Sequence, residues 1–515
     1  MALRINFSPL ILPIFGNFIV IISIAGYFFL IPGSIVVHDL LDAGVRGDRI
    51  PDVAFRLHLS LSLRYERWAS DRVASEQAAK LRVGNISGTE WPVFGSVFYL
   101  WATESLQEAW EDDPDRSPLA PNDYARNAIE AAVNLVTDPN HASWVKSHWG
   151  DDYLHCENIF YRMLQIAALT THYKLTGTAD NLTTLRKLVE DLTAELDESE
   201  TGLLDDYPGQ CFPGDVTTAI ACIQRADSVL GSDHASFAQR ALRGFVGISA
   251  DPIGLPPYQA DSETGECIGT SRGCSNSYIC LFAPEVWPAT AEKWYELYED
   301  YYWQEKWTAA GFREFPNTLP GGDWYMDVDA GPVLAGHGIS ACAFGVGAAR
   351  ANGRYDHAYP LTAEMLAISW PLPNGILALP RLLSDAVDAP LVGEAAILFS
   401  LTRTPAEGVV IRKGGHLPIF VWLLLFFYFG IGSILVLRST VMFRRRFRNL
   451  GSAFPLPGIQ TSLWVFLIIG AAIGVLGGHY ILSILLSVVA LVIPVQSVLG
   501  FPNLTVTTHG GTTSS

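Results

Sequence analysis

The residues between Gly321 and Pro332 have types and spacing that suit acid–base chemistry. The stretch contains three carboxylates and two aromatic rings: Asp323, Asp327, Asp329, Trp324 and Tyr325. The apolar segment Val333–Ala351 follows and predicts a helix, and carboxylates are stabilised at a helix N-terminus. Asp329 alone would suffice as the N-cap, with Pro332 in the first turn. The remaining groups make this stretch a candidate functional site.

Acidic and aromatic residues also precede the other apolar segments of the chain. They are Glu90 and Trp91; Trp149, Asp151, Asp152 and Tyr153; Asp205, Asp206, Tyr207 and Asp215; Arg272 and Asn276; Asp385 and Asp388. Cleavage of a glycosidic bond needs one carboxylic acid and one carboxylate. We predict Asp327 or Asp329 as one catalytic carboxylate and Asp152 or Glu157 as the opposing one.

Aromatic side chains near these carboxylates could stack on sugar rings. The predicted substrate-binding residues are Trp91, Trp149, Tyr153, Trp324, Arg272 and His337. Arg272 would orient the substrate, or would pair with Asp327 instead. His337 is more typical of a core histidine than of a base.

A helical interpretation of the run from Tyr153 to Tyr161 places Glu157 on the same face as both tyrosines, at spacings of four residues. A charge in such an apolar helix is costly unless it has a partner. Glu157 therefore either faces the lumen of the fold or is satisfied by Arg162 and His155. Asp152 has a structural alternative as a helix cap.

Polar and apolar helical segments alternate six times within residues 50–405. The polar segments lie near 54–79, 121–137, 180–198, 234–247, 288–308 and 355–369, and the apolar ones begin near Trp91, Asp152, Pro213, Arg272, Pro332 and Leu391. A hairpin repeat of about 60 residues closes naturally into a ring with the apolar helices inside. The pattern resembles an (α/α)6 toroid, and an open α-solenoid is the alternative. The predicted fold class is all-α.

Three further segments are apolar enough to cross a bilayer at about 20 residues per span. They predict an uncleaved anchor at residues 8–32, a span at 415–438, and two spans at 461–501 divided at Gly477-Gly478-His479. Arginines mark the cytoplasmic side of spans. Here they stand before the first span and after the second, at Arg4, Arg438, Arg444, Arg445, Arg446 and Arg448. We therefore expect four transmembrane helices, with residues 50–405 outside the cytoplasm and the tail 502–515 inside.

The net charge of −18 argues against nucleic acid as a partner. None of the seven cysteines forms a C-x-x-C motif, and Cys267 and Cys274 are spaced plausibly for a disulfide. The sequence contains no P-loop, no G-x-G-x-x-G and no cluster with metal-ligand spacing. We predict a reaction without metal or cofactor.

Two short features are similar to the linalool dehydratase/isomerase-like toroids. They are the run Glu157–Tyr161 with the later Leu175-Thr176-Gly177 turn, and the cysteines around Phe212-Pro213. The resemblance implies acid–base work on a terpenoid alcohol. Its nearest site matches here would be Cys211, Cys222 and His155.

The residues as a whole favour a multi-pass membrane protein whose outer domain acts on a glycan, as a hydrolase or lyase. Lyase or epimerase chemistry on a uronic acid remains open, because Arg272 could neutralise its carboxylate. The alternatives are a dehydratase/isomerase acting on a hydrophobic alcohol, and a binding protein without catalysis. The expected partners are the bilayer and a carbohydrate or other small organic substrate.

Overall fold

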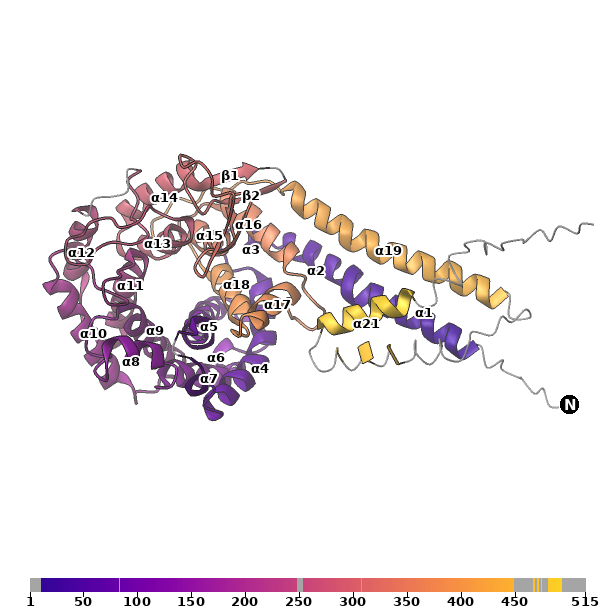
Figure 1. Ribbon diagram of the computed structural model, residues 1–515, viewed down its shortest axis with the longest axis horizontal. Helices are drawn as coiled ribbons and strands as arrows, with labels where there is room; N and C mark the ends of the chain where they lie inside the picture. Colours follow the sequence, from indigo (N-terminus) through magenta and orange to yellow (C-terminus); the bar gives the residue numbers. More distant parts are fainter. Residues whose placement is uncertain are drawn as a thin grey trace, which may run out of the picture. The chain divides into compact units, whose positions relative to one another are not determined.

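The computed structural model describes residues 11–82, 84–247, 253–306, 308–448 and 480–492, with 466–467, 470–471 and 474 (Figure 1). It is mainly helical, as predicted. Its contacts divide the chain into two compact units. One unit is Ser34–Leu425, which we call the helical domain, and the other combines Met1–Gly33 with Phe426–Ser515.

Among the described residues, two helices are long and apolar enough to cross a membrane, Phe15–Leu40 and Ile419–Arg445. The first consists of α1 (Ile11–Ala25), the π-helical turn η1 (Gly26–Leu30) and α2 (Ile31–Leu40), and the second lies in α19 (Ile419–Arg448). The predicted spans at 8–32 and 415–438 overlap these helices. Of the predicted pair at 461–501, the described residues include α21 (Tyr480–Val492). Arg4, the Gly477–His479 break and the tail 502–515 lie outside the described residues.

The helical domain contains two series of helices that alternate along the chain. The more polar series is α4 (Asp52–Ala74), α7 (Arg126–Thr137), α10 (Leu182–Glu198), α12 (Ala235–Gly247), α14 (Pro288–Tyr302) and α16 (Tyr355–Ile368). The more apolar series, here called the central helices, is α5 (Ile86–Asp112), α9 (Ile159–Thr176), α11 (Pro213–Leu230), α13 (Gly273–Val286), α15 (Ile339–Ala351) and α18 (Val392–Thr402). Shorter helices are α3 (Ala43–Arg46), α6 (Pro121–Tyr124), α8 (Ser143–Trp149) and α17 (Ala378–Ala386).

The central helices contact one another in a cycle. Each packs on the next one along the chain, and the last, α18, packs on the first, α5. Figure 1 shows these six helices around a common centre, with the polar series outside them. Local signals position the helix ends: Pro213 starts α11, and Gly177 and Gly231 end α9 and α11 at φ of 70° and 66°.

Two helix starts differ from the prediction. Helix α9 begins at Ile159 rather than near Asp152, because residues 150–158 form turns and Asn158 adopts φ of 45°. The helical interpretation of Tyr153–Tyr161 is therefore wrong. Helix α15 begins at Ile339 with Gly338 as its N-cap, so the roles predicted for Asp329 and Pro332 at a helix N-terminus are also wrong. The spacing of the repeats is less regular than the sequence suggested.

Short strands occupy residues 324–338, where the sequence predicts the start of the helix that begins at Ile339 in the structure. Strands β1 (Trp303–Lys306) and β2 (Ala309–Phe312) form one antiparallel hairpin. Strands β3 (Trp324–Asp327), β4 (Gly331–Leu334) and β5 (His337–Gly338) form a three-stranded antiparallel sheet. Pro332 lies in β4, opposite Met326. The acidic stretch of the sequence is thus a β-hairpin, with Asp329 in its turn.

Candidate functional site

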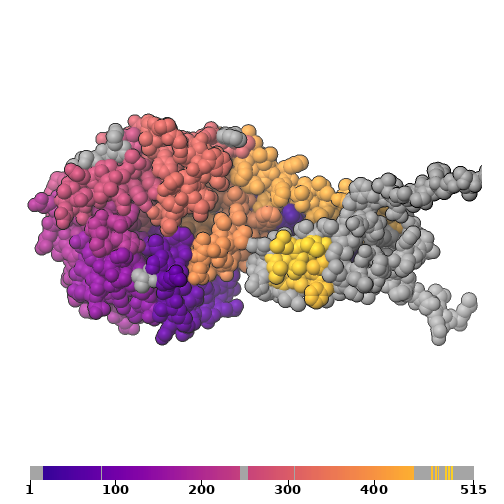
Figure 2. Space-filling model, viewed as in Figure 1, coloured from indigo at the N-terminus to yellow at the C-terminus, as the bar shows by residue number. Residues whose placement is uncertain are grey.

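Aromatic side chains fill the middle of the cycle of central helices. The aromatic layer comprises Phe94, Phe98 and Trp101 of α5, Phe160 of α9, Tyr278 and Phe282 of α13, Phe344 of α15 and Phe399 of α18. Neighbouring ring centroids are 4.1 Å apart for Phe94 and Phe98, and 4.9 Å for Phe98 and Phe399. Figure 2 shows atoms across the central gap that the ribbons leave. A candidate site with titratable groups is therefore expected at the ends of the central helices.

The C-terminal end of the central helices is closed by ion pairs. Arg225 binds Glu285 at 2.7 Å, and Arg403 binds the same carboxylate. Lys174, in the last turn of α9, binds Glu104 at 2.6 Å. Cations near helix C-termini are favoured by the helix dipole. Because the carboxylate of Glu285 is matched by two guanidinium groups, burial is outweighed and its pKa is lowered to about 2. This end is built for stability.

The N-terminal end carries four carboxyl groups, Glu90, Asp206, Asp215 and Asp329, which we call the acidic cluster. Glu90 lies in α5, one helical turn before Phe94 of the aromatic layer. Asp215 lies in the first turn of α11, and Asp206 is in the preceding loop. Electrostatic interactions connect Glu90 with Asp206, and connect Asp329 with both Glu90 and Asp215. Residues far apart in the sequence thus form one cluster, next to the aromatic layer.

Asp206 and Asp215 form a proton-sharing pair. The carboxylate of Asp206 is buried and accepts hydrogen bonds from the backbone N–H groups of Phe160 (2.9 Å) and Phe212 (3.3 Å). Asp215 is half-buried and within hydrogen-bond reach of Asp206. Burial, and the mutual repulsion of nearby carboxylates, raise the pKa of both groups. The pair therefore retains a proton at a pH where isolated aspartates would both be ionised.

Glu90 is the second carboxyl group that holds a proton near neutrality. Burial raises its pKa to about 7, against a hydrogen bond that lowers it. That bond is donated by the Tyr207 hydroxyl to Oε2 of Glu90, at 2.7 Å. Trp149 supports the same loop by donating its indole N–H to the backbone oxygen of Asp206, at 3.0 Å. Burial therefore brings the pKa of Glu90 into the neutral range.

Replacing Tyr207 with Phe is expected to raise the pKa of Glu90 above its wild-type value of about 7, because the lost hydrogen bond stabilises the carboxylate. The pKa can be measured from the infrared carboxyl band, taking the difference between each protein and its Glu90→Gln derivative. Tyr325→Phe is the matched control, because Tyr325 donates to Asp327 instead. An unchanged Glu90 titration in Tyr207→Phe would contradict the assignment.

Asp329 is tied to the cluster through the loop before α13. Its carboxylate accepts a short hydrogen bond from the Tyr258 hydroxyl. The Arg272 guanidinium lies 4.4 Å from the centroid of the Tyr258 ring. Arg272, the N-cap of α13, binds Asp327 at 2.8 Å and the fully buried Glu314 at 2.6 Å. Of the two roles considered for Arg272, the structure shows the ion pair with Asp327.

Asp327 has a structural role in the hairpin turn. Besides Arg272, its carboxylate accepts the Tyr325 hydroxyl (2.9 Å) and the backbone N–H groups of Asp329 (3.1 Å) and Ala330 (2.7 Å). Although burial opposes it, these donors lower the pKa of Asp327. A carboxylate held by four donors is poorly suited to giving or taking a proton.

The carboxylates predicted to oppose it lie in the loop 150–158. Asp152 is exposed there, and its interactions among the described residues are made by its backbone oxygen. Glu157 is half-buried and accepts the backbone N–H of Asp205, at 3.1 Å. Arg162 binds the backbone oxygen of Glu157 and pairs with Glu195, and His155 pairs with Asp191. Among the described contacts, none joins Asp152 or Glu157 to Asp327 or Asp329.

The predicted binding residues divide into two groups. Trp149 bonds the backbone of Asp206 and Arg272 lies against Tyr258, so both are near the acidic cluster, and Trp91 directly follows Glu90 in α5. The other three lie apart from it. Tyr153 packs on Tyr161 and Lys146, Trp324 is 75% exposed on β3, and His337 lies in β5. Burial, with Lys306 and Arg313 nearby, lowers the pKa of His337 to about 4.

The structure joins none of the seven cysteines in a disulfide, so the one considered for Cys267 and Cys274 is not formed. Cys274 donates to Glu314 instead. Cys211 is buried near Asp206, whereas the neighbours of Cys222 are Arg225 and Glu285 at the other end of α11. His155 interacts with Asp191 and Lys187. No described interaction unites the three residues that the dehydratase resemblance implied.

A metal-like grouping exists elsewhere in the helical domain. Glu299, Asp356 and His357 lie close enough together to offer ligands to one ion. Arg354 already pairs with both carboxylates, at 2.8 Å from Asp356. Its guanidinium supplies the positive charge that a metal would bring. The grouping fits a structural ion network better than a metal centre.

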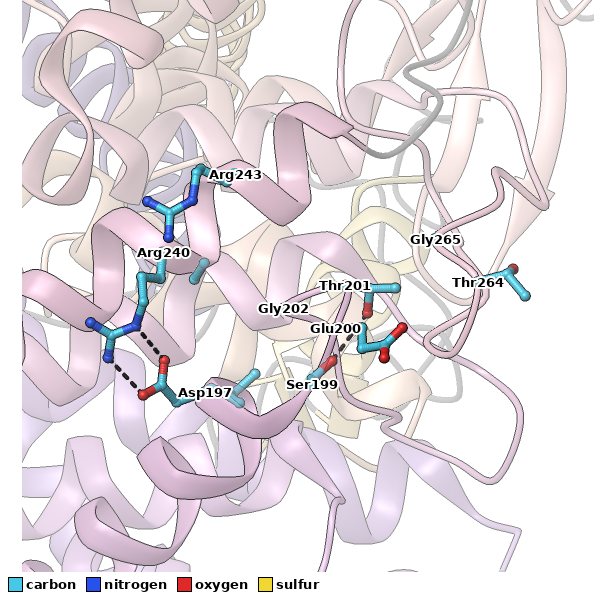
Figure 3. Close-up of a pocket in the computed structure, with 11 residues that line it drawn as sticks. Asp197, Ser199, Glu200, Thr201, Gly202, Arg240, Arg243, Thr264 and Gly265 are labelled. Carbon is cyan, nitrogen blue, oxygen red and sulfur yellow. Dashed lines mark hydrogen bonds and ion pairs between the residues drawn. The ribbon is translucent and has the colours of Figure 1, made fainter.

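A surface hollow of about 450 Å³ has no residue of the acidic cluster in its lining, which Figure 3 shows. It lies between α10, α12 and the turn at Thr264 and Gly265. Arg240 on its rim is paired with Asp197 at 2.6 Å. The lining contains no aromatic ring and is open to solvent. The hydrogen bond from Arg240 lowers the pKa of Asp197 there, in contrast to the raised pKa values of the acidic cluster.

No known protein family matches the chain, and no curated protein matches it at a significant level. Its function is therefore argued from the acidic cluster. Sequence reasoning placed Glu90, Asp206 and Asp215 among the converging loops but did not choose them as catalytic. The available signal was position: Glu90 one turn before Phe94, and Asp215 directly after the Pro213 helix start.

Proposed function

We propose that this protein is a membrane-anchored enzyme that acts on a glycan by carboxylate acid–base chemistry. The closed cycle of central helices supports an (α/α)6 toroid as its fold. The two long apolar helices, with arginines following the second, support display of the toroid outside the cytoplasm by a multi-pass anchor. The acidic cluster at one end of the central helices is the proposed active site.

One observation carries the proposal: the cluster combines carboxyl groups that hold protons near neutral pH with an exposed carboxylate, Asp329. A glycosidic oxygen leaves as a hydroxyl only if it receives a proton, and Glu90 or Asp215 can donate it. Asp329 would activate a water molecule or attack the anomeric carbon. Tyr207 and Tyr258 hold Glu90 and Asp329 in place by hydrogen bonds.

This assignment changes the roles predicted from the sequence. Asp329 is retained as the opposing carboxylate, and Glu90 and Asp215 replace Asp152 and Glu157 as acids. Trp91 and Trp149 remain the proposed sugar platforms, because Trp149 bonds the backbone of Asp206 and Trp91 directly follows Glu90 in the chain. Asp327 is proposed to position the hairpin through Arg272.

A second candidate function is acid-catalysed dehydration or isomerisation of a hydrophobic alcohol. The observation that favours it is the aromatic layer directly beneath the protonated acids, because aromatic faces stabilise developing positive charge. The buried thiol of Cys211 near Asp206 is the residue that this chemistry would use. Cys211→Ser would disable it and would leave glycan cleavage unchanged.

The proposal is tested by incubating the purified full-length protein with panels of oligosaccharides and aryl glycosides and measuring released reducing ends against pH. Activity is expected to fall as the pH rises through about 7 where Glu90 is the donor, or through about 8 where Asp215 is, because the donor then loses the proton that the leaving group requires. Glu90→Gln should lose this pH dependence together with the activity. Turnover that rises through that pH range, or that persists in Glu90→Gln, would rule out this acid.

A further inference from the structure

One face of the β3–β4 hairpin is apolar and uncovered. Side chains alternate between faces along a strand. Tyr325 and Asp327 share the face that meets Arg272, whose guanidinium lies 5.6 Å from the Tyr325 ring. Trp324 and Met326 occupy the opposite face, where Leu334 is the cross-strand partner of Trp324.

The exposure of that face is unusual for its composition. Trp324 and Met326 are each 75% exposed, Leu334 is 50% exposed, and Val328 in the turn is 51% exposed. Leaving so many large apolar side chains in water is unfavourable, and contiguous apolar surface of this kind marks a site of interaction. We call these four residues the apolar hairpin face.

The base of the β3–β4 hairpin is bonded to strand β1, and the turn after β1 contacts the start of α19, the second candidate membrane helix. Asp323, directly before β3, binds Lys306 of β1 at 3.0 Å, and Gln304 of β1 donates to the backbone oxygen of Ala335 at 3.3 Å. The backbone oxygen of Thr308, two residues after Lys306 in the β1–β2 turn, accepts the N–H of Phe420 at 2.8 Å. The first turn of α19 is thus bonded to the turn that holds the hairpin.

We propose that the apolar hairpin face lies in the surface of the bilayer that α19 enters. The helix supplies the membrane and fixes where it begins, close to Ile419, while the bonds through Thr308 and Lys306 hold the hairpin beside that point. Exposed Trp and Met side chains suit the boundary between headgroups and acyl chains, where tryptophan is enriched. The same hairpin carries Asp329, so this contact places the acidic cluster next to the membrane surface.

Trp324 allows the contact to be measured in the full-length protein, independently of any enzymatic activity. The protein is reconstituted in phosphatidylcholine nanodiscs, with and without bromine on the acyl chains, and tryptophan fluorescence is recorded. Bromine is expected to quench Trp324, so Trp324→Phe should lose less fluorescence on bromination than the wild type. Trp149→Phe is the control, because Trp149 ends α8 and bonds the backbone of Asp206, away from the hairpin face, and it should show the wild-type loss.

Two results would overturn the proposal. One is a bromine-dependent loss of fluorescence that is equal in the wild type and Trp324→Phe, together with quenching of Trp324 by aqueous iodide. This result would place the hairpin in water. The other is a doubled particle mass that Trp324→Phe restores to one copy, which would make a second chain the occupant. Thermal unfolding midpoints of both variants are compared with that of the wild type to check that each variant is folded. A conservative change at the exposed Trp324 should preserve the midpoint.

Discussion

Asp215→Asn is expected to lower turnover of a cleavable glycan by about 10²–10⁴-fold, the usual contribution of a positioned general acid. The Asp206–Asp215 pair retains a proton, and an amide in place of Asp215 cannot transfer one to a leaving oxygen. The measurement is the rate of reducing-end release at a pH where the wild type is active. Asp152→Asn is the matched control, since Asp152 is exposed in the loop 150–158 and should retain activity.

The same variant has a readout that needs no substrate. Asp215 has a folded pKa above its unfolded value, so the folded state retains a proton that the unfolded chain releases. Wild-type stability should therefore decline as the pH rises from the unfolded pKa, near 4, toward the raised folded one. Asp215→Asn should reduce this decline, measured as the change of the unfolding midpoint with pH. An identical pH slope in both proteins would show that Asp215 is not the proton carrier.

The largest stability loss is expected from Arg272→Met. Its guanidinium is the cation that pairs with Glu314, a carboxylate with no exposed surface, and it also holds Asp327 of the hairpin. Removing one partner of a buried pair leaves an uncompensated charge and costs about 3–5 kcal/mol. We expect a clear fall in the unfolding midpoint of the helical domain, followed by circular dichroism or differential scanning fluorimetry.

Two companion variants separate charge burial from lost packing. In Arg272→Met/Glu314→Gln no buried charge remains, so this double variant should be more stable than Arg272→Met alone. Arg240→Met removes an arginine of similar shape from an exposed pair with Asp197, and its effect should be far smaller. Equal losses in Arg240→Met and Arg272→Met would contradict the role assigned to Arg272.

Burial of Arg272 is matched by a tight backbone approach at the next residue. A Cβ atom added to Gly273 would lie 1.9 Å from the backbone oxygen of Arg313. The N–H of Gly273 donates to the backbone oxygen of Glu314 at 2.8 Å. The start of α13 therefore lies directly against the chain that follows β2. This packing brings Glu314 to Arg272 from 42 residues along the sequence.

Much of the helical framework could be predicted from hydrophobic periodicity and helix-end signals. Helices α10, α12 and α16 lie within a few residues of their predicted positions, and Pro213 and Gly177 mark real helix ends. These features are local, because each depends on residues within one or two turns of the helix. The two long apolar helices were recognisable for the same reason.

The sequence pattern failed where polar side chains bond across the chain. Residues 150–158 have a helix-compatible pattern, yet Glu157 binds the backbone of Asp205 and the segment remains in turns. The stretch before α15 resembles a capped helix start, but it forms a hairpin held by Arg272. In each case a partner about 50 residues away outweighs local preference.

The sequence by itself determined that this chain is mainly helical, strongly acidic and equipped with apolar helices long enough for a membrane. Only the tertiary structure decided which carboxyl groups matter, because a pKa depends on burial and on neighbouring charges rather than on residue type. Asp327 and Asp215 are both aspartates near element ends, yet four donors surround the first and another carboxylate faces the second. Packing made one a structural anion and the other an acid.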